Sequence, residues 1–429
     1  MIKITIITLL VSLVAGVPIA FSIGIAGIAG LYFGSDMPML MVIQKFFAGI
    51  NSFSYMAIPL FILAGAIMGK GGISGRIVKF ASAFLSWLPG GLGITSVGAN
   101  MIFAGVSGSG AAAVSAIGGI TAPEMIKKGY ERSFTAAITA GGGSLGPIIP
   151  PSVDMIVFGC ITGFSIGRLF LGGIVPGIII GGSLMLYCFL YAKKRGIDFG
   201  GKFVGKNAWT AFKNAIWALL MPLIIIGGIM LGIFTATEAG GIACVYGLIV
   251  SLFVYKEMKL RDLIEVMRTA VVNMAMVMMI IGMSTIFSYI LALEKVGNDI
   301  VNFMLSITTD PTGLFFLVAA FMIVIGCFME SLAALPIILP IIYPMFCDIG
   351  VNPNQLGVVF ALSTVLGGLT PPVGIYLFLS MTICKARMAQ TVVPHMLIVV
   401  GIMITTIVLC ILIPAIPTFI PNLIMGPLL

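Results

Sequence analysis

The sequence predicts an all-α polytopic membrane protein built from two inverted repeats, each with a re-entrant helical hairpin and a broken transmembrane helix. Of its 429 residues, 60% are hydrophobic and 8% are charged, whereas a soluble domain carries roughly 25% charged residues. Apolar runs such as "AIWALLMPLIIIGGIMLGIF" recur along the chain and have the length of about 20 residues that spans a bilayer as a helix. A transmembrane barrel would instead alternate apolar and polar residues, so a bundle of membrane helices is the expectation.

The distribution of charge indicates which connections face the cytoplasm. The net charge is +8, and the basic residues gather in four polar segments: Lys127, Lys128 and Arg132; Lys193, Lys194, Arg195, Lys202, Lys206 and Lys213; Lys256, Lys259, Arg261 and Arg268; Lys385 and Arg387. This grouping is typical of cytoplasmic loops, and it argues against nucleic acid as a partner. Connections such as "TTDPTG" and "CDIGVNPNQ" lack Lys and Arg and are expected on the outer side.

The first segment, "MIKITIITLLVSLVAGVPIA", fits two interpretations. Lys3 before an apolar stretch would suit a signal peptide. We favour a first membrane span, because further apolar segments follow at once.

The seven cysteines are dispersed singly and form no CxxC pair, so neither disulfides nor a zinc site are expected. The single histidine, His395, begins a late apolar segment and is expected to be a packing or interface residue.

A shift of 221 residues aligns two parts of the chain and predicts an internal repeat. It places Pro150-Pro151 on Pro371-Pro372 without a gap from about residue 102 to 158. About a dozen identities occur there, where this composition gives roughly four or five by chance. The predicted halves are residues 1–212 and 213–429. They are expected to be inverted, because the basic "EMIKKGYER" of the first half aligns with the uncharged or acidic "MFCDIGVNPNQ" of the second.

Each half contains two interruptions within apolar sequence. Hairpins are expected near 88–120 and 312–347, and broken helices over 133–165 and 355–383. The Gly-rich and Pro-rich stretches "VSGSGAAA", "GGGSLGPIIPPS", "GCFMESLAAL" and "LSTVLGGLTPPVG" mark them. Unpaired backbone groups in hydrocarbon cost several kcal/mol each, so such stretches must line a polar site or be buried in protein.

Two interpretations of these interruptions remain open. The glycines could merely let helices approach and the prolines merely kink them. Alternatively, the carbonyls at one helix end could bind a cation and the N–H groups at the next helix start could bind a carboxylate. We favour the second, because two pairs of interruptions recur at related positions. The hydroxyls expected to complete the oxygen shells are those of Ser107, Ser109, Ser144, Ser331, Ser363, Thr364 and Thr370.

Three carboxylates lie within or beside apolar segments, where charge is costly and often functional. Asp154 follows the first Pro-Pro pair and is expected near a substrate vestibule, and Glu330 is expected at the second hairpin tip. Glu238 is more simply a residue at the start of a helix, following Thr235.

The segments "SGSGAAAVSAIGGITAPEMIKKGY", "GGGSLGPIIPPS", "GIFTATEAG" and "LGGLTPPVG" resemble the large membrane subunit of the tripartite ATP-independent periplasmic (TRAP) transporters. The resemblance covers essentially the whole chain. It implies an inner-membrane, Na⁺-driven importer of organic acids with an elevator mechanism, in which interleaved scaffold and transport domains slide past each other. It also implies two protein partners, a small four-helix membrane subunit and a periplasmic substrate-binding protein. Both termini of this chain are expected on the periplasmic side.

The resemblance further implies site residues. One Na⁺ site would use Ser107, Ser109, Gly110, Gly143, Ser144 and Pro147, and a second would use Gly326, Met329, Ser331, Thr364, Gly367 and Thr370. The substrate would lie near Ser152, Asp154, Pro371 and Pro372. No cofactor other than the coupling Na⁺ is expected, and candidate substrates are C4-dicarboxylates, sialic acid and other sugar or keto acids.

Other functions were weighed against this one. A membrane-embedded enzyme has little to build on, since the chain has one histidine and no HExxH motif. An ATP-driven pump would need a GxxxxGK[ST] loop, which the sequence lacks. A stand-alone, ion-coupled exporter or antiporter of related fold stays open as the alternative.

Overall fold

The computed structural model describes residues 1–197, 200–371, 374–388 and 392–428. Within these ranges every regular element is helical, and seven helices are long and apolar enough to cross a membrane. Many large apolar side chains on their outer faces are exposed, among them Leu223, Phe253 and Ile264. Such faces suit lipid rather than water, so the predicted all-α membrane fold is confirmed.

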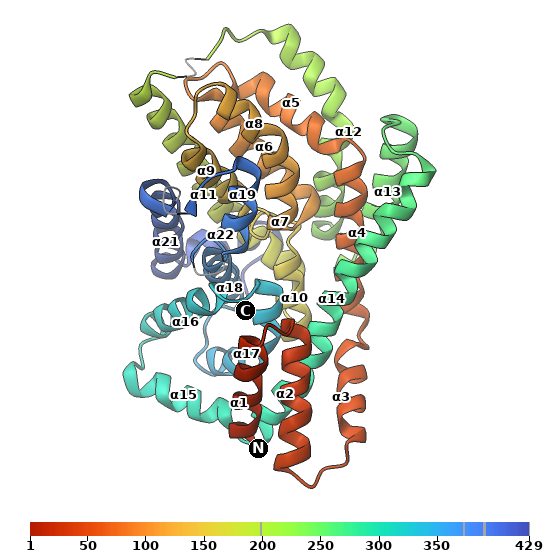
Figure 1. Cartoon of the computed structure of the whole chain (residues 1–429), viewed down its shortest axis with the longest axis vertical. Coiled ribbons are helices and arrows are strands. Elements are labelled where there is room, and N and C mark those ends of the chain that lie inside the picture. The colour runs from red at the N-terminus through yellow and green to blue at the C-terminus, as the bar shows by residue number, and fades with distance from the viewer. Residues whose placement is uncertain (198–199, 372–373, 389–391, 429) are drawn as a thin grey trace.

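The first half of the chain passes from a group of short helices at the N-terminus to a long span, α11 (Figure 1). Its elements are α1 (Ile2–Val14), α2 (Ile19–Gly34), α3 (Leu40–Ile50), η1 (Phe53–Met56), α4 (Ala57–Lys70), α5 (Ile73–Leu85), α6 (Gly91–Ser107), α7 (Gly110–Ala113), η2 (Val114–Gly118), α8 (Gly119–Lys127), α9 (Arg132–Gly143), α10 (Val153–Thr162) and α11 (Ile166–Arg195).

The second half follows the same order of elements. It comprises α12 (Gly205–Met230), α13 (Ala236–Ile249), η3 (Val250–Val254), α14 (Leu260–Leu293), α15 (Val296–Ile307), α16 (Pro311–Gly326), α17 (Ser331–Asp348), α18 (Pro353–Gly367), α19 (Ile375–Cys384), η4 (Val392–Met396), α21 (Leu397–Leu412) and α22 (Ala415–Met425). Adding 221 to the bounds of α6, α9 and α10 gives nearly those of α16, α18 and α19. The boundary placed between residues 212 and 213 falls inside α12, so the division at that point stays a prediction.

The two hairpins enter the molecule from opposite ends. Figure 1 shows α6, α7 and α8 in the upper part of the view and α16 and α17 in the lower part. Each hairpin has a broken helix beside it: α9 packs against α6, and α18 packs against α16. The inverted arrangement expected from the charges is therefore present in the fold.

An ion-dipole contact joins the two halves of the chain. The Arg132 guanidinium, at the start of α9, donates to the Cys384 carbonyl at the end of α19 over 3.0 Å. A cation at a helix C-terminus satisfies carbonyls that have no partner within the helix. The contact also places the basic group at Lys127–Arg132 beside the one at Lys385, as the charge pattern predicts for a single membrane face.

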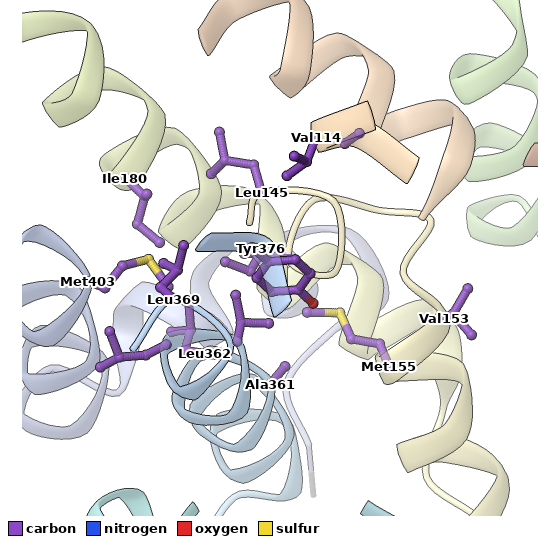
Figure 2. Close-up of a cluster of buried hydrophobic side chains, with 14 of the residues drawn as sticks. Val114, Leu145, Val153, Met155, Ile180, Ala361, Leu362, Leu369, Tyr376 and Met403 are labelled. Atoms are coloured by element: carbon purple, nitrogen blue, oxygen red, sulfur yellow. The ribbon is translucent and has the colours of Figure 1, made fainter. Parts of the chain in front are cut away.

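The core of the molecule is one large apolar cluster to which both halves contribute. Figure 2 shows its central part, with Leu145 from the first interruption and Leu369 from the second in the same cluster as Tyr376. Because the two interruptions share one core, the backbone that leaves its helix there is buried in protein rather than exposed to lipid.

Glycines at the crossing of α16 and α18 set how closely these helices approach. A Cβ on Gly326 would lie 2.6 Å from the Thr364 carbonyl oxygen, and a Cβ on Gly367 would overlap the Gly326 backbone. The neighbouring atoms are backbone and cannot rotate away, so side chains are excluded at both positions.

We predict that Gly367→Ala destabilises the protein by about 1–3 kcal/mol, the usual cost of forcing extra volume into a close-packed site. Gly401→Ala is the matched control, since Gly401 is also helical and has no atom within 4 Å of its Cβ position. Thermal unfolding of the detergent-solubilised chain measures both. Equal midpoints for the two variants would contradict the steric argument.

Candidate functional site

The tip of the first hairpin is built around a glycine in the left-handed region. Gly108 has φ +62° and ends α6 after Ser107, where a residue with a side chain would be strained. Ser109 then caps the returning limb, because its Oγ accepts from the Ala112 N–H at 3.5 Å. The tip thus sets free carbonyls of α6 beside free N–H groups of the next helix.

The first broken helix lies directly against this tip. A Cβ on Gly143 would come within 3.2 Å of the Gly110 carbonyl oxygen, and a Cβ on Gly146 would lie 2.7 Å from the Ser109 carbonyl carbon. The glycines of this stretch therefore allow two backbone segments to approach each other closely. Ser144 is fully buried here and donates to the Gly141 carbonyl over 2.7 Å.

Ser152 restarts the broken helix as α10. Its Oγ accepts from the Met155 N–H at 3.2 Å and donates to the Pro147 carbonyl. The Val153 N–H reaches across to the Gly108 carbonyl at 3.4 Å. The interruption is hydrogen-bonded to itself and to the hairpin tip, as irregular backbone at membrane depth requires.

The second half makes a related but different contact. The crossing of Gly326 and Gly367 joins the end of α16 to the end of α18, whereas in the first half the interruption lies against the start of the returning limb. Thr364 lies inside α18, in its last turn, and its hydroxyl donates to the Phe360 carbonyl at 2.9 Å. The Thr370 hydroxyl donates to the Leu366 carbonyl at 2.6 Å. A hydroxyl that donates its proton keeps lone pairs for another partner.

One cavity of about 640 Å³ brings parts of both halves together. The first half contributes the tip from Ser107 to Ala112, with Pro147 and Asp154, and the second contributes Glu330, Ser331 and Tyr376. Helices α4 and α14 form the opposite wall, which includes Gly65, Gly69, Thr269 and Asn273. A cavity of this size suits a small organic molecule.

Asp154 is the buried charge of this cavity. It is 3% exposed, and its Oδ2 has no hydrogen-bond partner among the described residues. Three polar side chains of the other half, those of Ser331, Glu330 and Tyr376, are close enough to interact with it. A buried carboxylate without a cationic partner is costly, so this oxygen is positioned for a cation or a proton.

Three residues of the wall formed by α4 and α14 are exposed. They are Gly69 at the end of α4 and Thr269 and Asn273 in the first half of α14, whereas Asp154 and Ser331 are buried. Helix α14 begins directly after the basic segment at Lys256–Lys259. The exposed residues of this wall therefore belong to the half of α14 that follows the basic segment.

The predicted site residues fall into two groups. Ser107, Ser109, Gly110, Pro147, Asp154 and Ser331 line the cavity. Gly143, Ser144, Ser152, Gly326, Thr364 and Gly367 are buried, and Met329, Thr370 and Pro371 partly buried, in or beside the two hairpin tips and interruptions. Pro372 lies outside the described residues. Ser363 is buried, and its hydroxyl has no partner among the described residues.

The sequence interpretation missed Tyr376, Thr269 and Asn273. Asn273 is a polar residue in a long apolar span, which is a signal for function, but its direction could not be read from the sequence. Tyr376 lies among apolar residues in the sequence, so nothing there marks it as a cavity residue. Its ring packs against Gly110 of the first hairpin tip, and a Cβ on Gly110 would lie 2.6 Å from it.

Two other polar residues have structural roles. Glu238 accepts from the Thr235 N–H at 2.8 Å and completes a capping box at the start of α13, as the simpler interpretation expected. His395 is buried and hydrogen-bonds the Tyr187 hydroxyl at 2.8 Å, with Glu131 at 3.3 Å. The cysteines are free, and no group of metal-ligating side chains occurs among the described residues.

Comparison with known proteins extends this description. The family model "Tripartite ATP-independent periplasmic transporter, DctM component" matches residues 6–416. The isethionate TRAP transporter permease protein DctMQ of Oleidesulfovibrio alaskensis is 40% identical over 95% of this chain, and the chain spans 64% of that protein's length. The C4-dicarboxylate TRAP transporter large permease protein DctM of Vibrio cholerae is 37% identical over 97% of this chain and 96% of its own.

Among solved structures, the Neisseria gonorrhoeae MtrF protein, described as one of a class of antimetabolite efflux pumps, superposes with a TM-score of 0.59. The match covers 92% of this chain and 94% of MtrF at 14% identity. That likeness concerns the fold alone. The sequence relatives are transport permeases and not enzymes, so the chain is a transport protein. It belongs to the DctM family, the large membrane component of the tripartite ATP-independent periplasmic transporters.

Proposed function

We propose that this protein imports a small organic acid across the bacterial inner membrane, driven by Na⁺ and supplied by a periplasmic binding protein. The observation that carries the proposal is the cavity of about 640 Å³ that both hairpin tips line together with the buried Asp154. Each tip offers carbonyl and hydroxyl oxygens for a cation and N–H groups for an anion. A cation and an organic anion can therefore be held together, which couples their transport.

We assign one Na⁺ site to each half. In the first half the Gly143 backbone lies close to the Gly110 carbonyl oxygen, and in the second the Gly326 backbone lies close to the Thr364 carbonyl oxygen. Na⁺ prefers oxygen ligands, and carbonyls freed at helix ends supply them in membrane carriers. The buried Asp154 carboxylate adds the negative charge that favours a cation nearby.

The substrate is proposed to lie in the cavity between the tips, with its acid group on the N–H groups near Ser109 and Ser331. The relatives named above are described as permeases for isethionate and for C4-dicarboxylates, which are small organic anions. C4-dicarboxylates, sialic acid and other sugar or keto acids remain the candidate classes, and a sulfonate fits the same helix-end chemistry.

Na⁺ supplies enough energy for this transport. One Na⁺ that moves down about 100 mV releases roughly 2.3 kcal/mol, and a tenfold concentration gradient adds about 1.4 kcal/mol. Two ions more than offset the electrical cost of importing one monoanion, so no ATP motor is needed.

An elevator mechanism accounts for the two walls of the cavity. The hairpins and broken helices would move as a transport domain, and α4 and α14 would belong to the scaffold that it passes. Because the exposed residues Thr269 and Asn273 belong to the half of α14 that follows the basic segment, we assign this arrangement to the state that faces the cytoplasm.

The proposed partners follow from the family's description as tripartite and periplasmic. A small four-helix membrane subunit would pack on the apolar scaffold surface, and a periplasmic binding protein would deliver the substrate. We propose that both termini of the chain face the periplasm.

Export by the same fold is the second candidate, because the structurally similar MtrF is described as an efflux pump. A likeness at 14% identity does not decide the direction of transport. The closer sequence relationship to TRAP permeases favours import.

We predict that proteoliposomes containing the transporter take up a labelled organic acid only with an inward Na⁺ gradient and with the periplasmic binding protein outside. A panel of dicarboxylates, sugar acids, keto acids and sulfonates identifies the substrate, and K⁺ replaces Na⁺ in the control. Uptake that is independent of both Na⁺ and the binding protein would exclude the proposed function.

Thr364→Val and Ser109→Val are expected to raise the Na⁺ concentration for half-maximal uptake about tenfold, since each removes one polar contact to a charge, worth about 1.5 kcal/mol. Thr405→Val is the matched control, because the Thr405 hydroxyl also donates within its helix, to the Gly401 carbonyl at 2.8 Å, but is exposed. The same Na⁺ response in all three variants would remove these residues from the ion sites.

Asp154→Asn is expected to lower Na⁺-driven uptake at least tenfold while the protein still folds, because the amide keeps the shape of the carboxylate and removes its charge. Asp348→Asn, at the exposed end of α17, serves as the control. Initial uptake rates and thermal unfolding, measured on the same preparations, separate loss of function from loss of fold. Uptake at the level of the control would show that the buried charge is dispensable.

A further inference from the structure

A separate polar cavity shares no lining residue with the cavity at the hairpin tips. It has a volume of about 280 Å³ and lies between α5 and α12. Its lining residues are Arg76, Lys79, Asn207, Thr210, Ala211 and Asn214. Two cations and three hydrogen-bonding side chains thus share one cavity, and none of its lining residues carries a carboxylate.

The two cations of this cavity differ in how they are held. Arg76 is fixed, because its guanidinium is 2.6 Å from the Glu257 carboxylate and lies 3.8 Å from the centre of the Tyr255 ring. Lys79 is exposed and forms no ion pair with any described residue. Arg76 is therefore a fixed part of the cavity wall, whereas the Lys79 ammonium is available to an anion.

The polar wall is contributed by one face of α12. Asn207, Thr210 and Asn214 are spaced so that they lie above one another along the helix. The Thr210 hydroxyl donates to the Lys206 carbonyl at 2.9 Å, so its lone pairs can accept from a hydroxyl of a ligand. The two asparagine amides can donate to phosphate oxygens. The cavity accordingly suits a phosphate that carries hydroxyl groups.

Aromatic rings lie on the same two helices as the cavity lining. Phe80 on α5 lies 6.2 Å from Phe212 on α12, between ring centres, and Trp209 stacks on Phe212 at 5.7 Å. The Lys213 ammonium lies 5.3 Å from the centre of the exposed Trp209 ring. Tryptophan and lysine together are typical of the boundary between the bilayer and water. This places the cavity at the depth of lipid headgroups.

The adjoining chain identifies which membrane surface this is. The basic segment that includes Lys202 and Lys206 leads directly into α12, and such segments face the cytoplasm. The cytoplasmic leaflet carries the negative surface potential of anionic lipids, and basic pockets between membrane helices on that side bind their headgroups.

We propose that the cavity between α5 and α12 binds the headgroup of an anionic phospholipid of the phosphatidylglycerol or cardiolipin type. The phosphate lies against Lys79 and the asparagine amides, the glycerol hydroxyl meets Thr210, and the acyl chains run along Phe80 and Phe212. The lipid fixes α5 against α12 at the cytoplasmic boundary of the scaffold.

Native mass spectrometry of the full-length chain in detergent tests the proposal by titration with phosphatidylglycerol, cardiolipin and phosphatidylcholine. Lys79→Gln should weaken binding of phosphatidylglycerol about fivefold, the effect of removing one basic residue near an anionic lipid. Asn214→Leu should also weaken it while leaving every charge in place. Lys128→Gln is the matched control, since Lys128 is exposed on the same basic face but outside the cavity, and it should bind as the unaltered protein does.

Three results would overturn the proposal. They are equal affinity in Lys79→Gln and Lys128→Gln, phosphatidylcholine bound as tightly as phosphatidylglycerol, and displacement of the lipid by millimolar inorganic phosphate. The last would assign the cavity to free phosphate. Unfolding midpoints of all variants are measured alongside, and Asn214→Leu keeps the test decisive if Lys79→Gln proves unstable.

Discussion

Backbone that leaves its helix inside a membrane must find partners within the protein, and this requirement organises the whole molecule. In the described part of the chain these places include two hairpin tips and two broken helices. Each broken helix is placed against the neighbouring hairpin, and glycines at Gly146 and Gly367 allow the backbones to approach closer than side chains would permit. Hydrogen bonds such as that from the Val153 N–H to the Gly108 carbonyl then satisfy groups that lipid could not.

The same arrangement leaves a few polar groups unsatisfied, and these define the site. The oxygen of Asp154 has no partner among the described residues, and hydroxyls such as Thr364 keep free lone pairs after bonding to their own helix. Backbone groups that have hydrogen-bond partners keep these segments rigid. The buried oxygens without a partner are the positions where binding a cation lowers the free energy most. The glycine contacts that let the backbones approach thus lie beside the groups proposed to bind the ion.

The two halves share a plan but are not interchangeable. In the first, the broken helix meets the hairpin where the returning limb begins, at Ser109 and Gly110, and in the second it meets the end of the entering limb, at Gly326. Tyr376 of the second half fills the space beside Gly110 of the first, so the two halves are joined across the cavity. The wall that α4 and α14 give to that cavity, with Thr269 and Asn273, is a further departure from symmetry.

The sequence by itself determined the membrane class, the two repeats and the positions of the helix interruptions, because composition, glycine and proline act locally on the backbone. It also singled out Ser109, Asp154 and Ser331, which line one cavity, since polar groups in apolar segments are few. Only the tertiary structure decided that Tyr376, Thr269 and Asn273 line the cavity. It also decided that the hydroxyls of Ser144 and Ser152 donate to nearby carbonyls. The physical reason is that membrane helices are apolar on every side, so the sequence carries no periodic signal for which face meets a cavity, a neighbouring helix or lipid.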